Sequence, residues 1–77
     1  MTAHIALKLF ASLKRYTPAQ ADRFSITPGL TIADLLKELN VPLAEVKLVF
    51  VNGVKQDMNM PLKDGDRVGI FPAVGGG

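Results

Sequence analysis

The residues that could carry chemistry in this chain lie at its C-terminal end, which reads Gly75-Gly76-Gly77. They follow an apolar, strand-like run, Val68-Gly69-Ile70-Phe71-Pro72-Ala73-Val74. Because glycine has no Cβ, such a tail can enter a narrow channel that any other residue would block. The group that it delivers there is the α-carboxylate of Gly77. We therefore predict that Gly77 is the reacting residue and that Gly76 lets it pass.

Terminal glycines also have ordinary explanations, since linkers, expression remnants and frayed ends are rich in glycine. A functional tail is favoured because it leaves an apolar strand directly, so that packing would fix its origin while its tip stays free. We expect one domain over residues 1–77, with residues 72–77 as a flexible C-terminal tail. The residues of this region expected to bind partners are Phe71, Pro72, Val74 and Gly75.

Side-chain catalysis has little support in the sequence. The chain has no cysteine, which excludes a disulfide framework, a thiolate metal site and a cysteine nucleophile. A single histidine, His4, cannot build a histidine-rich metal site, and we interpret it as a strand-end residue. The two carboxylates of Asp64-Gly65-Asp66 are too few to form a calcium-binding loop, and this segment indicates a turn. We predict neither a metal site nor a bound cofactor.

Composition narrows the class of protein further. With 77 residues the chain is one domain, and 48% apolar residues are enough for a packed core. The net charge of +2 comes from scattered basic residues, without the dense basic patch of a nucleic-acid binder. No apolar run approaches the length of a membrane span, and no signal peptide is evident. We expect a soluble, cytoplasmic protein that binds neither nucleic acid nor membrane.

The elements that must position the tail follow from periodicity. Residues 11–21 are polar and predict a loop with room for one helical turn. A helix is expected after Thr31, because Thr31 with Asp34 three residues later resembles a capping box with Asp in place of the usual Glu. Pro42 prevents the helix from continuing beyond Asn40. Its apolar stripe consists of Ile32, Leu35, Leu36 and Leu39. The expected strands are His4–Phe10, Asp22–Thr27, Val46–Val51 and Arg67–Phe71, with a short return strand at Val54–Lys55 after the hairpin signal Asn52-Gly53.

This order of elements predicts an α+β fold. Two strands, a helix and two or three further strands match the β-grasp, or ubiquitin-like, arrangement: a mixed sheet of four to five strands with one main helix packed on one face. Periodicity alone also allows another small α+β roll. Because Leu48-Val49-Phe50-Val51 is apolar on both faces, we expect this strand to be central.

The face of the sheet that the helix leaves uncovered is a candidate partner surface. An apolar patch there would mark such a surface. We predict that Phe10, Val51 and Phe71 belong to this patch, and two alternatives stay open. In the first alternative the assignment of residues to the two faces is off by one residue, and in the second the loop over residues 11–21 covers the patch. The predicted uncovered set is Ala6, Phe10, Val49, Val51 and Phe71, and the predicted core set is Leu7, Leu9, Leu48, Phe50, Val68 and Ile70.

Over nearly its whole length the chain resembles the small sulfur-carrier proteins of the ubiquitin-like superfamily called MoaD and ThiS. The resemblance is carried by Leu9-Phe10-Ala11-Ser12-Leu13-Lys14, Thr31-Ile32-Ala33-Asp34-Leu35-Leu36, Val51-Asn52-Gly53 and Leu62-Lys63-Asp64-Gly65-Asp66-Arg67-Val68, followed by Phe71-Pro72 and the terminal glycines. Two segments, Phe10-Ala11 and Phe71–Val74, are more similar to MoaD, the small subunit of molybdopterin synthase, than to ThiS. Ala73 and the third glycine, Gly75, depart from the MoaD pattern.

The resemblance implies a mechanism. A ubiquitin-activating-type adenylyltransferase, similar to MoeB or ThiF, would use ATP to adenylate the Gly77 carboxylate, and a sulfur donor would convert the adenylate to a thiocarboxylate. The chain would then donate sulfur in molybdopterin biosynthesis by inserting its tail into the large molybdopterin synthase subunit. Catalytic side chains would belong to these partners, so the chain is a carrier or an incomplete subunit, and ATP is used only by the activating partner.

Three other functions stay open at this stage. A ThiS-like carrier would send sulfur to the thiazole of thiamine or to tRNA. A ubiquitin-like protein modifier would join its Gly77 carboxyl to lysines of other proteins. A plain interaction domain would keep its binding after loss of Gly76 and Gly77.

Overall fold

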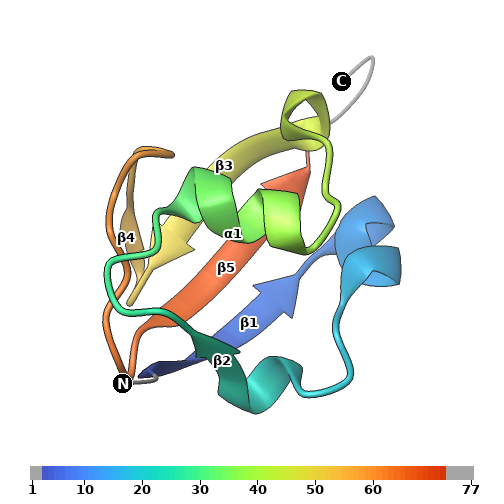
Figure 1. Cartoon of the computed structure of the whole chain (residues 1–77). Coiled ribbons are helices and arrows are strands. Elements are labelled where there is room, and N and C mark those ends of the chain that lie inside the picture. The colour runs from blue at the N-terminus through green and yellow to red at the C-terminus, as the bar shows by residue number, and fades with distance from the viewer. Residues whose placement is uncertain (1–2, 73–77) are drawn as a thin grey trace.

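The structure is a computed structural model, and it describes residues 3–72 of the chain. The strands and the main helix follow one another along the chain in the predicted order (Figure 1). The strands are β1 (Ala3–Leu9), β2 (Phe24–Ile26), β3 (Val46–Val51), β4 (Val54–Lys55) and β5 (Arg67–Pro72). The helices are α1 (Ile32–Glu38) and three short 3-10 helices, η1 (Ala11–Tyr16), η2 (Ala21–Arg23) and η3 (Leu43–Glu45).

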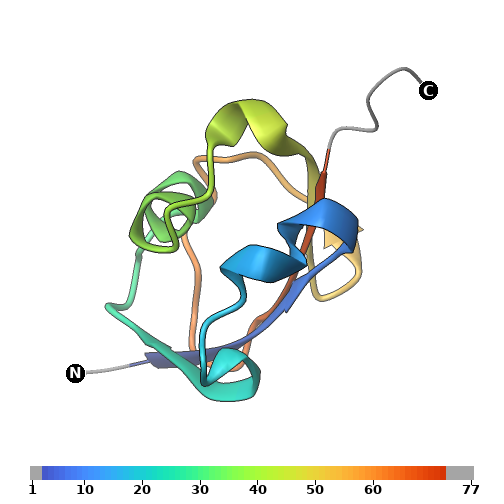
Figure 2. The ribbon, with the colours of Figure 1, turned by 90° about the vertical axis from the view of Figure 1, so that its right-hand side faces the viewer.

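The five strands form one mixed sheet in the order β2-β1-β5-β3-β4. β1 and β5 are parallel, and the other neighbours are antiparallel. α1 lies across one face of this sheet in both views (Figures 1 and 2). The β-grasp prediction is therefore confirmed, with five strands and one main helix.

The predicted position of β3 in the sheet is wrong. β5 is the central strand, with β1 on one side and β3 on the other, whereas β3 has only the two-residue strand β4 beyond it. The last strand of the chain thus inserts between two earlier ones. β5 also includes Pro72, which pairs with Val46, so Pro72 belongs to the sheet rather than to the tail in which it was predicted.

The helix begins and ends as the sequence predicts. The Oγ1 of Thr31 accepts a hydrogen bond from the backbone N–H of Asp34 at 3.2 Å, which is the N-cap contact of a capping box. Asn40 takes the left-handed conformation at φ 62°, which turns the chain out of the helix. The stripe Ile32, Leu35, Leu36 and Leu39 is buried against the sheet.

The segment between β4 and β5 completes the core over the start of the helix. The backbone N–H groups of Ile32 and Ala33 donate to the carbonyls of Met60 and Met58, so the helix N-terminus has partners that its own turns cannot supply. Leu62 is fully buried and anchors this otherwise irregular segment in the core.

The two faces of β3 are the reverse of the prediction. Val49 and Val51 are 1% and 2% exposed and belong to the core beneath α1, whereas Leu48 and Phe50 are partly exposed on the other face. The assignments for β1 and β5 are correct, since the core contains Leu7, Leu9, Val68 and Ile70. The alternative in which the face assignment is off by one residue is therefore correct, but only for β3.

Residues 11–21 form more structure than a loop. Leu13 of η1 is fully buried, so this helix packs into the core at the end of β1.

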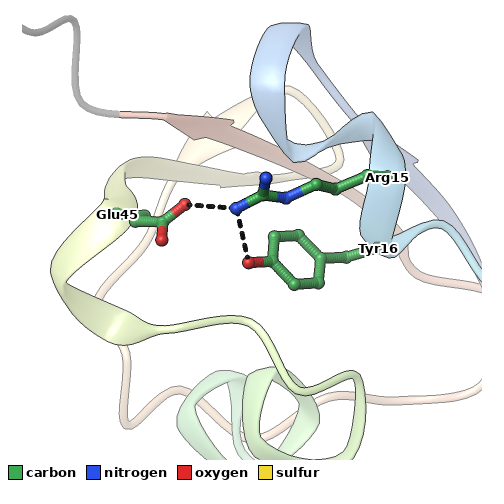
Figure 3. A network of polar contacts seen from close by, with 3 residues as sticks. All are labelled: Arg15, Tyr16 and Glu45. Atoms are coloured by element: carbon green, nitrogen blue, oxygen red, sulfur yellow. Dashed lines mark hydrogen bonds and ion pairs between the residues drawn. The ribbon is translucent and has the colours of Figure 1, made fainter.

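Arg15 joins η1 to η3. Its guanidinium lies 3.7 Å from the Glu45 carboxylate, donates to the Tyr16 hydroxyl at 3.0 Å and stacks on the Tyr16 ring (Figure 3). The hydrogen bond to Tyr16, and then the charges of Tyr16 and Glu45, raise the pKa of Arg15, so the guanidinium stays charged. The contact is solvent-exposed and orients the two segments rather than forming a reactive site.

Within residues 3–72, none of the helices has the length and apolar character needed to cross a membrane.

Candidate functional site

The strand that leads to the C-terminal glycines, β5, is held at its start by a buried carboxylate. Asp66 is 4% exposed, and its two oxygens accept hydrogen bonds from Asn52 Nδ2 at 3.0 Å and from the Lys63 backbone N–H at 2.8 Å. Asn52 Oδ1 in turn accepts from the Arg67 N–H at 3.0 Å. We call these hydrogen bonds among Asn52, Lys63, Asp66 and Arg67 the clasp. It joins the β3–β4 turn to the first residue of β5. A buried polar group of this kind is tolerated because it is fully hydrogen-bonded.

The neighbouring turn behaves as predicted. Gly65 has φ 88°, a left-handed value that favours glycine. Asp64 Oδ1 accepts from the backbone N–H of His4 at 2.8 Å, which places His4 at the start of β1 as expected. Among the described residues, no three histidine or acidic side chains come together as a metal site requires.

Replacing Asp66 by alanine is expected to destabilise the domain by about 2–3 kcal/mol, because two donors lose a charged acceptor in a partly buried place. Asp66→Asn keeps the size and one carbonyl oxygen, and should cost less. Chemical denaturation followed by circular dichroism measures both. Asp57→Ala, a change at an exposed acid of the same chain, serves as control. Equal stability of D66A and D57A would show that the clasp contributes nothing.

At its far end β5 carries an aromatic cluster on the face away from α1. Phe71 of β5 stacks on Phe10, which follows β1, with ring centroids 4.3 Å apart and an interplanar angle of 5°. Phe50 of β3 meets the edge of Phe71 at 5.5 Å and 72°. Such pairs contribute about 0.5–1.5 kcal/mol each beyond the area they bury. We call Phe10, Phe50 and Phe71 the aromatic cluster.

Beside the aromatic cluster lies an apolar hollow of about 500 Å³ over the centre of the sheet. Its floor is Gly69, which faces the hollow with no side chain. A Cβ built on Gly69 would lie 3.5 Å from the Phe10 ring and 3.6 Å from the Phe71 ring, which is ordinary contact distance. The residues that shape the hollow include Lys8, Phe10, Phe50, Arg67, Gly69 and Phe71.

The outer face brings together only part of the predicted partner-binding set. Phe10, Phe71 and Pro72 are partly exposed and lie at the same end of β1 and β5. Val51 does not join them, because it is 2% exposed in the core beneath α1, and its predicted place on the uncovered face is wrong. Gly77, Gly76, Gly75 and Val74 fall outside the described residues.

Two residues of this surface were missed at the level of sequence, Phe50 and Gly69. The signal for Phe50 is Lys55: the two pair across the β3–β4 hairpin, so they share a face, and a lysine opposite a phenylalanine indicates the solvent side. Gly69 interrupts an apolar strand, and a glycine there often marks the close approach of another group.

Comparison with protein families gives a match to the model of the ThiS family over residues 7–77. No curated protein matches the chain. Among solved structures, the Haloferax volcanii HVO 2177 protein is 27% identical with a TM-score of 0.76, over 99% of this chain and 88% of that one. A putative molybdopterin converting factor subunit 1 from Pyrococcus furiosus is 25% identical with a TM-score of 0.64, over 94% of this chain and 99% of that one.

Two further structures extend the comparison. A chain of the complex of subunits 1 and 2 of the molybdopterin-converting factor from Helicobacter pylori is 26% identical with a TM-score of 0.51, and each chain is covered completely. Small archaeal modifier protein 1 from H. volcanii shares the fold at 24% identity and a TM-score of 0.71, over 94% of this chain and 99% of that one. Because the family model matches residues 7–77, from within β1 to the terminal glycines, the chain belongs to the ThiS family of ubiquitin-like proteins.

Proposed function

We propose that this protein is a sulfur carrier whose Gly77 carboxylate is adenylated and then converted to a thiocarboxylate, which donates sulfur in molybdopterin biosynthesis. The observation that carries the proposal is the ThiS-family match, which includes the terminal glycines. The proposed place of action is the cytoplasm. The chain itself contributes the carboxylate and the docking surface, while ATP and the catalytic side chains belong to partners.

The proposed chemistry suits a chain without cysteine. A carboxylate is a poor electrophile, so the adenylyltransferase would attach AMP to Gly77 and release pyrophosphate. The terminal sulfur of a persulfide on another protein would attack the carbonyl carbon, and AMP would leave. A thiol would then reduce the resulting acyl disulfide, leaving the thiocarboxylate on Gly77 and a disulfide on the donor. Because the chain has no thiol, the sulfur must come from elsewhere.

The molybdopterin pathway is favoured over thiamine by two neighbours. One, 25% identical, is described as a putative molybdopterin converting factor subunit 1, and the other, 26% identical, is a chain of the complex between subunits 1 and 2 of such a factor. By analogy we propose that Phe10, Phe71 and Pro72 contact a large subunit while Val74, Gly75 and Gly76 lead Gly77 to its active site. A ThiS-like carrier role is the second candidate, supported by the name of the family model.

Mass spectrometry of the intact chain tests the proposal. Incubation with a ubiquitin-activating-type adenylyltransferase from the same organism, ATP and a persulfide donor should add the mass difference between sulfur and oxygen. Fragmentation should place that difference on Gly77. A variant without Gly77 is the control and should gain nothing.

Two results would count against the carrier role. One is the absence of any mass gain with an enzyme that adenylates the chain. The other is the appearance of Gly-Gly remnants on lysines of other proteins with no thiocarboxylate, which would assign the chain to the protein modifiers. Supplying the thiocarboxylated chain to a molybdopterin synthase large subunit and to a thiazole synthase then separates the two sulfur pathways.

A further inference from the structure

The hairpin between β3 and β4 contains a pair of residues that the proposed function does not use, Asn52-Gly53. Val51 and Val54 pair across it, so the turn consists of these two residues, with φ values of 54° and 83°. Both are exposed, and a Cβ built on Gly53 would meet nothing within 4 Å. The turn is therefore open to water, and no Cβ hinders the Gly53 amide nitrogen. Of the three asparagines in the chain, only Asn52 precedes a glycine.

The side chain of Asn52 is at the same time part of the clasp. Its Nδ2 donates to Asp66 Oδ1 at 3.0 Å, and its Oδ1 accepts from the Arg67 N–H at 3.0 Å. Its backbone N–H donates to the Arg67 carbonyl at 2.8 Å. Three hydrogen bonds thus direct Asn52 toward the start of β5. A reaction between its side-chain amide and the Gly53 nitrogen requires the amide to turn away from Asp66 and Arg67.

We propose that Asn52 is a site of spontaneous deamidation and that the clasp restrains the reaction. The Gly53 nitrogen loses its proton and attacks Cγ of Asn52, so that an N–Cγ bond forms. The Cγ–Nδ2 bond breaks, and Nδ2 takes up a proton and leaves as ammonia. Water then opens the five-membered succinimide ring by breaking one of its two bonds from a carbonyl carbon to the Gly53 nitrogen. Breakage at Cγ gives aspartate, and breakage at the main-chain carbonyl carbon gives isoaspartate. Water is the one co-reactant, and nothing is oxidised or reduced.

The products cannot rebuild the clasp. An aspartate at position 52 has no Nδ2–H for Asp66 and places a second negative oxygen beside a carboxylate that is 4% exposed. An isoaspartate also adds a carbon to the main chain of a two-residue turn, which changes the register that the turn imposes. Each event would therefore weaken the hold on the first residue of β5 irreversibly. The inference goes beyond the proposed function, because it does not involve the carboxylate of Gly77.

Peptide mapping by mass spectrometry during prolonged incubation at mildly alkaline pH tests the site. In the chain unfolded by urea, Asn52 should deamidate faster than Asn40 and Asn59, which precede valine and methionine. In the folded chain Asn52 should react more slowly than in urea on the order of tenfold or more, because the clasp must open first. Equal rates in the folded and unfolded chains would overturn the restraint. Asn52 reacting no faster than Asn40 and Asn59 in urea would overturn the site.

Variants of Asp66 test whether the clasp is the restraint. Asp66→Ala removes the acceptor of Nδ2 and should speed deamidation of the folded chain several-fold. Asp66→Asn keeps one carbonyl oxygen and should speed it less, and it reports on the clasp even where the alanine variant folds poorly. Leu39→Ala is the control, because it destabilises the core without changing a residue of the clasp. An equal acceleration in Leu39→Ala of the same measured stability would assign the effect to global unfolding and overturn the clasp as restraint.

The effect of the modification is tested with Asn52→Asp, which has the side chain of one product. Its thermal midpoint should fall by roughly 4–8 °C, because it loses a hydrogen bond and gains a like-charge contact. Asn59→Asp adds the same charge at another exposed asparagine and should leave the midpoint nearly unchanged. Equal midpoints of Asn52→Asp and Asn59→Asp would show that deamidation does not weaken the hold on β5.

Discussion

Val51→Asp is expected to remove much or all of the stability of the domain, whereas the same change at the adjacent residue, Phe50→Asp, is expected to leave it folded. Val51 is 2% exposed beneath α1, and an unpaired carboxylate there would cost on the order of 5 kcal/mol. A domain of this size has a total stability of about 4–12 kcal/mol. Phe50 is only partly buried on the opposite face, so its loss removes an edge contact with Phe71 and costs about 1–2 kcal/mol.

Far-ultraviolet circular dichroism and thermal denaturation of the two variants measure this difference. The pair is well matched, because both changes put the same poor strand former into β3. Two variants of equal stability would show that the faces of β3 are not divided as the structure has them.

Gly76→Val is expected to reduce thiocarboxylate formation on Gly77 by about 100-fold or more, because a displacement of the reacting atom by a single ångström can cost that much. The branched side chain would block the narrow channel that the proposed mechanism requires. Single-turnover formation of the thiocarboxylate, followed by mass spectrometry, is the measurement. Gly76→Ala, with one methyl group, should show a smaller loss.

The control for this prediction is Ser25→Val, which places the same side chain on an exposed strand position. It should form the thiocarboxylate at the wild-type rate, and circular dichroism should show that both valine variants are folded. Undiminished sulfur transfer to Gly76→Val would show that the tail tolerates a side chain at this position, and the terminal glycines would then not be explained by a narrow channel.

Local signals were sufficient for the helix and the turns. Thr31, Asp34 and Asn40 act within a few residues of their own positions, so the cap and the left-handed exit of α1 follow from the sequence. The same is true of Gly65 and of the hairpin at Asn52-Gly53, where both residues have positive φ. These features do not depend on which strands become neighbours.

Non-local features were harder to predict. β3 is apolar on both sides because its outer face belongs to the aromatic cluster, and an apolar run does not say which side the helix covers. Alternation from Lys47 is also misleading, since the register of β3 against β5 shifts between Val46 and Leu48. The centre of the sheet was misjudged for a related reason: β5 is central because of its parallel pairing with β1, which no local pattern reports.

The same parallel pairing bears on when the sheet of this protein can form during synthesis. The middle strand, β5, is the last of the described strands to be synthesised. The pairing of Ala6 with Arg67 can therefore form only after the other strands have been made. Contacts between such distant parts of a chain slow folding, because the intervening loop must be ordered first. A chain interrupted before β5 lacks both the middle of the sheet and the segment that carries the glycines. Among the described strands, closure of the sheet therefore depends on β5, because β1 and β3 have no direct pairing with each other until β5 lies between them.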